Sequence, residues 1–511
     1  MKPARSRNKI KMGPVIFLLG LILAGAFFGI QHMKNTGKLD GITADSNKKI
    51  KAKKGVKTVN IAVVSWGGYA GGQLFNKGFD QNSDSRFTKD YGLDVNFVLE
   101  NDPVKSMEMW KKDDIQVHWC TADAFSTIYA DIAQYDPKII FQSDWSRGGD
   151  AIVSTRVVKN VADLKGRKVA VALKTPSQSL LIKTLEANNM SINDIKIVEA
   201  PSAVEAAQMF KDGLVEAAVV WSPDDQICVN EVNGAKILTS TKDATNIIAD
   251  VFFVKGAWAE ANPEIIKKLV EGWMIGNAEI NSSEESKKEA IEVLAKGLNQ
   301  NDDDCEKAIN NVRLATFEDN KNFFGINSGY KGIKGENIYR NMGRTYSALK
   351  YAPTNIPDWK DITNRDALRD IDLSGSIHKA EPVFTFAAEA SDINTEAFAT
   401  KNVTINFTSG SANLDAVSQQ ALDTQVVNIL QTFGSVKVRV EGNTDNVGNP
   451  GLNKTLSKGR AQAVVNYLVQ TYGFDKNKFI VIGNGSDNPI ADNSSASGQA
   501  ENRRTEIKFI K

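Results

Sequence analysis

The sequence has 511 residues, which is too long for one hydrophobic core and predicts roughly two to four domains. Charged residues make up 24% and hydrophobic residues 42%, which excludes a mostly disordered chain and one that crosses a membrane many times. The net charge of +1 averages over unlike segments, with +11 over residues 1–57, −13 over 58–400 and +3 over 401–511. A basic head, an acidic middle and a mildly basic tail are expected to meet different partners.

Histidine and cysteine are too scarce for most metal or thiol chemistry. There are three of each, namely His32, His118, His378, Cys120, Cys228 and Cys305. No zinc-type spacing, Cys-x-x-Cys pair, P-loop, GxGxxG or nucleophile elbow occurs. His118 and Cys120 share an expected strand, where buried packing is favoured over a metal site with two ligands. The sequence therefore predicts a protein that is not an enzyme, with no metal, no cofactor and no nucleic-acid partner.

The amino terminus combines positive charge with an apolar run. Residues 1–12 hold five Lys and Arg, and the uncharged Gly13–Ile30 would span about 27 Å as a helix, close to a bilayer core of about 30 Å. We expect 1–12 to be cytoplasmic, 13–31 to anchor the chain in the inner membrane and the remainder to be exported. A cleaved signal peptide ending near Ala24–Ala26 is the alternative. The Lys-rich residues 32–57 are expected to be a flexible tether, either solvated or resting on anionic lipid.

Short β-branched runs alternate with helical patterns over residues 58–375. The expected strands are Val59–Ser65, Val95–Val98, Ile115–Trp119, Ile139–Phe141, Ala151–Val153, Val169–Ala172, Ile195–Glu199, Ala217–Val220 and Val251–Val254. The expected helices between them include Ser177–Ala187, Ala203–Asp212 and Pro263–Asn277. This alternation predicts parallel sheets covered by helices on both faces, and such sheets bind ligands at the carboxyl ends of their strands.

Three motifs in this region resemble a known family. Residues 160–171 (NVADLKGRKVAV), then Lys174–Ser179 (KTPSQS) at the start of a helix, then Val220–Pro223 (VWSP), follow the order seen in the second lobe of periplasmic substrate-binding proteins. Within that family the chain is most similar to the nitrate/sulfonate/taurine type of ABC transporters. The resemblance covers roughly residues 58–375. It implies two α/β lobes that close on a small-molecule solute by a hinge motion, with an ABC permease as a possible partner.

The same resemblance implies which residues border the cleft between the lobes. They are Trp66, Gly67, Tyr69, Thr121, Asp123, Ser177, Gln178, Ser179, Trp221 and Asp224. A helix N-terminus with Ser and Gln side chains suits an anion, and the aromatic rings offer flat apolar walls. In contrast, Asp123, Asp150, Asp224 and Asp225 near strand ends suit a cationic or neutral ligand better, unless they are helix caps or surface groups. The charge of the solute therefore stays open.

A smaller α+β pattern fills residues 401–511, after a segment at 376–400 that is expected to be a linker. The expected strands are Val403–Phe407, Val436–Val440, Phe479–Ile482 and Arg504–Ile510, and the expected helices are Ala416–Thr432 and Leu452–Gln470. Three of its segments, Gly442–Gly448 (GNTDNVG), Leu456–Ala461 (LSKGRA) and Glu501–Ile507 (ENRRTEI), closely resemble the OmpA-like peptidoglycan-binding domain.

The resemblance to the OmpA-like domain implies a specific ligand chemistry. A diaminopimelate stem peptide of peptidoglycan offers a free ammonium and a free carboxylate at one end. Asp445 is expected to pair with the ammonium, and Arg460 is expected to bind the carboxylate with its guanidinium fork. Asn453 and Arg504 are expected to be supporting donors. An ordinary internal ion pair between Asp445 and Arg460 is the alternative.

These segments together predict an N-terminal transmembrane helix, an α/β two-lobed clamshell and a C-terminal α+β domain. The expected location is the Gram-negative cell envelope, with an anchor in the inner membrane and periplasmic domains. We expect a solute-binding protein tethered to both membrane and cell wall, and a ligand sensor or envelope scaffold without a transport role is the alternative. An ion-driven stator is disfavoured because Gly13–Ile30 contains no ionisable aspartate.

Overall fold

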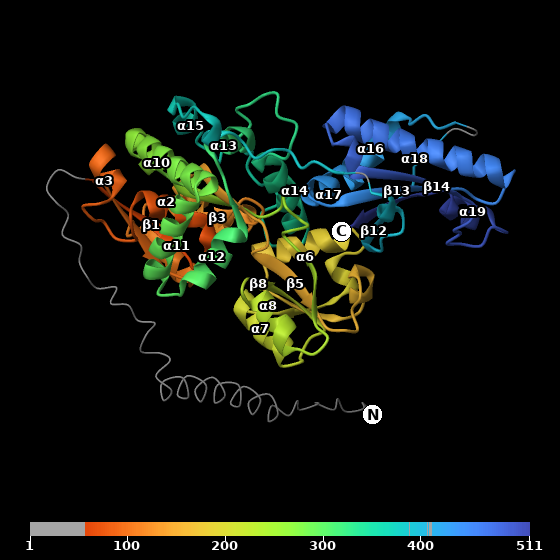
Figure 1. Cartoon of the computed structure of the whole chain (residues 1–511), viewed down its shortest axis with the longest axis horizontal. Coiled ribbons are helices and arrows are strands. Elements are labelled where there is room, and N and C mark those ends of the chain that lie inside the picture. Colours follow the sequence, from red (N-terminus) through yellow and green to blue (C-terminus); the bar gives the residue numbers. More distant parts are fainter. Residues whose placement is uncertain (1–56, 388, 406, 408–410) are drawn as a thin grey trace, which may run out of the picture. The chain divides into compact units, whose positions relative to one another are not determined.

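The computed structural model describes residues 57–387, 389–405, 407 and 411–511. The expected basic segment, the membrane anchor and all of the tether except residue 57 lie outside the described residues. In the part of the chain that is described, no helix is long and apolar enough to cross a membrane. Residues 57–511 form one compact unit, in which two lobes precede a C-terminal domain (Figure 1).

The first lobe is built around strands that meet at one sheet. A parallel bridge between Ile61 and Val117 joins the pair β1–β2 to the strands that follow. The order across the lobe is β2 (Leu93–Leu99), β1 (Lys57–Val63), β3 (His118–Thr121), β10 (Ala249–Lys255), β4 (Pro137–Ser146) and β11 (Val312–Leu314). β1 and β2 run parallel, whereas β10 is antiparallel to both β3 and β4.

Helices cover both faces of this sheet. They are α2 (Ala70–Phe75), α3 (Arg86–Tyr91), α4 (Pro103–Lys111), α5 (Phe125–Ile132), α9 (Gly256–Ala261), α10 (Pro263–Ser282), α11 (Glu284–Leu298), α12 (Asp302–Asn310), α13 (Phe317–Phe323), α14 (Gly335–Ala348) and α15 (Asp366–Asp370). α2 and α10 pack so closely that a Cβ on Gly276 would lie 2.1 Å from the carbonyl oxygen of Gly71. Glycine at position 276 permits this approach. This contact fixes the chain just after β1, where several predicted cleft residues lie.

The second lobe repeats the same strand arrangement. Its order is β7 (Lys196–Glu199), β6 (Lys168–Val171), β8 (Ala217–Trp221), β5 (Asp150–Ser154) and β9 (Lys236–Ser240), and its helices are α6 (Pro176–Glu186), α7 (Ala203–Lys211) and α8 (Asp224–Glu231). β6, β7 and β8 are parallel, but β5 is antiparallel to its two neighbours. The expectation of purely parallel sheets was therefore wrong, because β5 and β10 each enter a sheet from the other lobe.

Two connections join the lobes. β4 of the first lobe leads into β5 of the second, and β9 of the second leads back into β10 of the first (Figure 1). α14 belongs to the first lobe, and its residues Met342 and Tyr346 pack against Ile182 of α6 in the second lobe. The lobes thus meet along the crossing strands and this helix.

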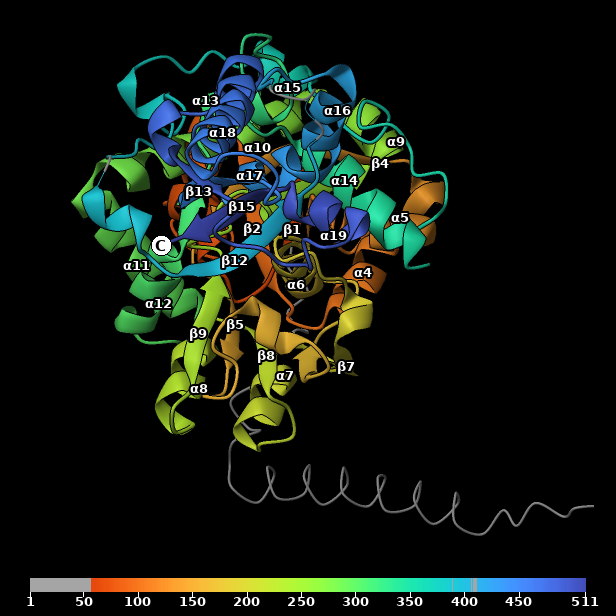
Figure 2. The same ribbon diagram turned by 90° about the vertical axis from the view of Figure 1, so that its right-hand side faces the viewer.

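The C-terminal domain is a four-stranded sheet with helices. Its order is β12 (Ala397–Val403), β15 (Thr505–Ile510), β13 (Lys437–Asn443) and β14 (Phe479–Gly485), and its helices are α16 (Ala416–Gln425), α17 (Val427–Thr432), α18 (Pro450–Tyr472) and α19 (Ala496–Asn502). β13 and β14 are parallel and the other pairs are antiparallel. α18 packs over β13 and β14 (Figure 2).

Two local expectations in this domain differ from the structure. The first strand is Ala397–Val403, which begins inside the expected linker, rather than Val403–Phe407. It begins early because it pairs with β15, which is distant in the sequence. The helix expected over 416–432 is broken at Val426, whose φ of −117° departs from helical geometry.

Candidate functional site

The end of β1 leads into a glycine-rich segment that contacts the crossing strands. The indole Nε1 of Trp66 donates to Asp144 Oδ1 at 3.3 Å, and the buried Tyr69 hydroxyl donates to Asp250 Oδ2 at 2.8 Å. A Cβ on Gly68 would lie 2.0 Å from Asp144 Oδ2, so the absence of a side chain there allows the close approach. Two of the predicted cleft residues therefore face carboxylates on β4 and β10.

Three predicted cleft residues of the second lobe lie in the first turn of α6. Ser177, Gln178 and Ser179 are all fully buried. Trp221 Nε1, at the end of β8, donates to Ser177 Oγ at 3.1 Å. Ser179 Oγ lies 2.7 Å from the hydroxyl of Tyr346 on α14. Hydrogen bonds thus join the end of β8 to the start of α6, and the start of α6 to α14.

Four buried aspartates lie where the lobes join, and we call them the acidic floor. They are Asp123 after β3, Asp144 on β4, Asp150 at the start of β5 and Asp250 on β10. Each is at most 4% exposed. Asp144 and Asp250 are direct partners in the β4–β10 ladder, and Asp150 is the partner of Trp221 in the β5–β8 ladder. Side chains from both lobes therefore surround a concentrated group of carboxyls.

Hydroxyl groups contact three of these carboxyls, Asp250 through Tyr69 and the other two through serines, while Asp123 is less well satisfied. Ser143 Oγ donates to Asp144 at 2.7 Å, and Ser146 Oγ donates to Asp150 at 2.8 Å. Within the described residues, neither carboxylate oxygen of Asp123 accepts a hydrogen bond of ordinary geometry. The hydroxyls of Ser179 and Thr121 nevertheless lie close enough to lower its pKa somewhat.

Burial keeps protons on the acidic floor. Loss of solvent contact raises the pKa of Asp123 to about 6 and that of Asp150 to about 7. The pKa of Asp250 is raised far above its usual range by burial and by repulsion from the other three carboxyls. Burial also raises the pKa of Asp144, although Arg147 opposes the shift. That guanidinium is itself paired with Glu381 at 2.8 Å.

Of the remaining predicted cleft residues, Thr121 lies beside this group, whereas Gly67 and Asp224 contact other parts of the chain. Thr121 pairs with Asp250 in the β3–β10 ladder, and its buried hydroxyl has no hydrogen-bond partner in the described part of the chain. A Cβ on Gly67 would lie 2.3 Å from the carbonyl oxygen of Ala308. Asp224 begins α8 and is half-buried, and it is not one of the four acids of the floor. Burial raises its pKa.

Sequence reasoning missed Asp144, Asp250 and Tyr346. The two aspartates carried a readable signal, because each is the lone acid of its strand, in IIFQSDWS and IADVFFV. A buried acid that interrupts a strand in this way often has a functional partner. Tyr346 had no such signal, because only the packing of α14 against α6 brings its hydroxyl to Ser179.

His118 and Cys120 pack in the core, as expected. The His118 ring nitrogens lie 2.8 Å from Ser106 Oγ and 2.7 Å from the carbonyl oxygen of Trp119. Burial lowers the pKa of this histidine to about 4. Cys120 is also buried, with a free thiol. Across the described residues, no group of three or more His, Cys, Asp or Glu side chains could hold a metal ion.

A second candidate site lies in the C-terminal domain, in the loop after β13. Asp445 Oδ2 is 2.6 Å from Arg503 Nη1, and Asp445 Oδ1 accepts from the backbone N–H of Val447 at 3.1 Å. The ion-pair partner of Asp445 is therefore Arg503 rather than Arg460. Sequence reasoning named Arg503 only as part of a motif.

Arg460 lies beside this pair on α18. Its Nε donates to the carbonyl oxygen of Ser411 at 3.1 Å, and its guanidinium lies 4.9 Å from the centroid of the Phe407 ring. Partial burial lowers its pKa, while the carboxylate of Asp445 raises it. A pocket of about 140 Å³ opens here, and it is lined by Thr404, Ile405, Phe407, Gly442, Asn443, Arg460, Ala500, Arg503, Arg504 and Thr505.

The two expected supporting residues have structural partners. Arg504 is 6% exposed, and its Nε donates to Glu506 at 2.8 Å while Nη2 donates to the carbonyl oxygen of Asn488 at 3.0 Å. Asn453 Nδ2 donates to the carbonyl oxygen of Val447 at 3.1 Å, which holds the loop that carries Asp445. Arg504 thus lines the pocket, and Asn453 supports its rim.

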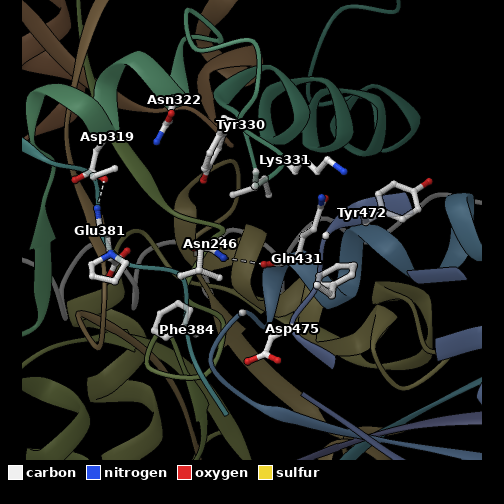
Figure 3. A pocket seen from close by; sticks show the side chains of 18 of the residues that line it. Asn246, Asp319, Asn322, Tyr330, Lys331, Glu381, Phe384, Gln431, Tyr472 and Asp475 are labelled. Atoms are coloured by element: carbon white, nitrogen blue, oxygen red, sulfur yellow. Dashed lines mark hydrogen bonds between the residues drawn. The ribbon is translucent and has the colours of Figure 1, made fainter. Parts of the chain in front are cut away.

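An open pocket of about 310 Å³ lies elsewhere, and Figure 3 shows its lining. None of the predicted site residues is among the residues that line it. Asn246 Nδ2 donates across it to the carbonyl oxygen of Gln431 at 3.0 Å, and Glu381 N donates to Asp319 Oδ1 at 2.7 Å. Because these polar groups already have partners, we assign the candidate sites to the acidic floor and to the loop of Asp445.

Two family models match the chain. Residues 130–295 match the NMT1-like family, and residues 406–503 match the OmpA family. The chain therefore carries a region that matches the NMT1-like family, followed by one that matches the OmpA family. Both resemblances drawn from the sequence are confirmed.

Individual relatives match parts of the chain. Peptidoglycan-binding protein ArfA of Mycobacterium tuberculosis is 32% identical over 161 residues, which cover 31% of this chain and 46% of that protein. Probable lipoprotein YiaD of Escherichia coli is 41% identical over 103 residues, covering 20% of this chain and 46% of that protein. The chain thus spans about half the length of these relatives. The periplasmic aliphatic sulphonate binding protein SsuA of Escherichia coli aligns with 61% of this chain and 99% of its own, with 16% identity and a TM-score of 0.48.

Proposed function

We propose that this protein is a non-enzymatic solute-binding protein of the Gram-negative cell envelope, of the ABC-transporter type, and that its C-terminal domain binds peptidoglycan. The solute binds between the lobes, at the strand ends that carry the predicted cleft residues. The main support is that buried polar groups from both lobes meet there, with Asp123 and Thr121 left without hydrogen-bond partners by the described residues. Buried polar groups normally have partners, so unpartnered ones at a lobe junction favour a ligand site.

The proposed wall site uses two charges of opposite sign. The carboxylate of a diaminopimelate stem peptide would bind the guanidinium of Arg460, with Arg503 beside it in the same pocket. The ammonium of the same amino acid would bind Asp445, whose side chain is 14% exposed in its ion pair with Arg503. Asn453 supports the site by holding the loop that carries Asp445, and Arg504 supports it by lining the pocket. ArfA, a relative over this region, is by name a peptidoglycan-binding protein.

Sedimentation with purified peptidoglycan sacculi of the diaminopimelate type tests the wall site. We expect the chain to sediment with them, and Asp445→Asn or Arg460→Lys to reduce the bound fraction at least about tenfold, because the first removes the negative charge and the second replaces the guanidinium fork by a single ammonium. Asp423→Asn is a matched control on α16, where the side chain accepts hydrogen bonds from Tyr467 and Tyr472. Full binding by both site variants would refute this assignment.

The arrangement of the whole chain is part of the same proposal. Residues 1–12 would be cytoplasmic, 13–31 would anchor the chain in the inner membrane and 32–57 would be the tether. The clamshell would occupy 58–375, and the wall-binding domain would follow a linker at 376–400. Membrane fractionation before and after alkaline washing tests the anchor. Cross-linking in cells to an ABC permease tests the transport role, and solute binding without such a partner would favour the sensor or scaffold alternative.

A further inference from the structure

We propose that the solute is an organic cation, whose ammonium or guanidinium group binds the acidic floor defined above. This inference rests on the proposed solute-binding function and deepens it by naming the chemical class of the solute. It departs from the anionic solutes that the resemblance to nitrate and sulfonate binders would imply.

The strand pairing provides the first argument. Asp144 and Asp250 are direct partners across the β4–β10 ladder, and both are almost completely buried. Ionising both would place like charges opposite each other in a buried sheet without a counter-charge, which is costly, and this cost is what keeps their protons on. A cation bound between the lobes would supply that counter-charge and allow the carboxyls to ionise.

The surrounding charges provide the second argument. Arg147 acts on the floor through Asp144; its Nη2 is paired with Glu381 at 2.8 Å, while its Nε and Nη1 have no hydrogen-bond partner among the described residues. Lys183, a buried lysine of α6, pairs with Glu186 at 2.8 Å. An anionic solute would therefore meet four carboxyls against one guanidinium whose charge is already shared with Glu381. A cationic solute would instead supply the missing counter-charge.

Asp123 provides an independent observation. Its side chain is fully buried, and neither oxygen has a hydrogen-bond partner among the described residues. It lies near Ser179 of the second lobe and close enough to Asp150 and Asp250 for repulsion between them. An unsatisfied carboxylate at this junction has the acceptor capacity that an N–H donor of a ligand needs.

The form of the site favours an organic cation over a metal ion. In the described part of the chain the acids do not converge to metal-binding distances in groups of three. The acids instead lie beside aromatic rings, since Trp66 and Tyr69 donate to Asp144 and Asp250. Aromatic faces next to carboxylates attract alkylammonium and guanidinium groups through cation–π interactions. Such a group has the size and the several N–H donors that dispersed carboxyls can share.

The test is a thermal-shift and calorimetric titration of the purified full chain at pH 8. The cationic probes are putrescine, agmatine and choline, and the anionic probes are taurine, methanesulfonate and nitrate. Tryptophan fluorescence reports on the clamshell alone, because all eight tryptophans lie between residues 66 and 359. We expect at least one cation to bind and no anion to bind. Asp123→Asn and Asp250→Asn should each weaken cation binding at least about tenfold.

Asp131→Asn is the matched control, because Asp131 is an exposed residue of α5 and should not affect affinity. If one floor variant fails to fold, the other one still tests the proposal. Binding of an anion would overturn the cation inference and leave the solute-binding function in place. Binding of no probe would overturn both. Cation binding that survives both floor substitutions would refute the assignment of the site.

Discussion

Replacing Asp150 with asparagine should stabilise the ligand-free clamshell at pH 8. Burial raises the pKa of Asp150 from 3.8 to about 7. The folded protein therefore keeps a proton that the unfolded chain releases, and the stability falls as the pH rises from about 4 to about 7. At pH 8 a shift of about 3 pKa units corresponds to about 4 kcal/mol, which is an upper limit because opening of the lobes also relieves the burial. Asparagine has no charge to bury and can still accept the hydrogen bond from Ser146.

Thermal melting followed by tryptophan fluorescence measures this effect. At about 2 °C for each kcal/mol, Asp150→Asn should raise Tm by up to about 8 °C at pH 8 and by less than about 2 °C at pH 4. The titratable groups that influence Asp150 are the other three acids of the floor, and Ser146 donates a hydrogen bond to it. Asp131→Asn should leave Tm unchanged at both values. An equal effect at the two pH values, or a loss of stability at pH 8, would refute the idea that ionisation of the buried floor is costly.

Two further predictions concern the C-terminal domain, and hydrogen–deuterium exchange of its backbone amides can follow both of them. Gly442→Ala should destabilise the domain by about 1–3 kcal/mol and weaken sacculus binding, because the new Cβ would lie 2.2 Å from the carbonyl oxygen of Ser457 on α18. Gly459→Ala, where the nearest atom lies at 3.6 Å, is the control and should be neutral or slightly stabilising. Lys478→Met should cost about 2–4 kcal/mol, because the buried Nζ donates to the carbonyl oxygens of Phe433, Gly434 and Val436 at 2.8–2.9 Å. The exposed Lys476→Met should have little effect, and equal losses from the two lysine variants would contradict the argument.

The regular elements of the fold could largely be predicted from local patterns. The helix expected over Ser177–Ala187 is Pro176–Glu186, and the one expected over Leu452–Gln470 is Pro450–Tyr472. The errors arose where contacts between distant segments determine the boundary or the direction of a strand. β12 begins at Ala397 because it pairs with β15, and the sheets of the lobes are mixed because β5 and β10 cross between them.

Residues 58–400 carry a net charge of −13, but composition does not specify where those acids lie in the fold. The sequence by itself determined the two family resemblances, the strand–helix alternation and the residues at several strand ends, because these features are local. Only the tertiary structure brought Asp144 and Asp250 face to face and paired Asp445 with Arg503. The reason is physical. The pairing of strands and the packing of helices depend on contacts between distant segments, and periodicity along the chain does not specify them.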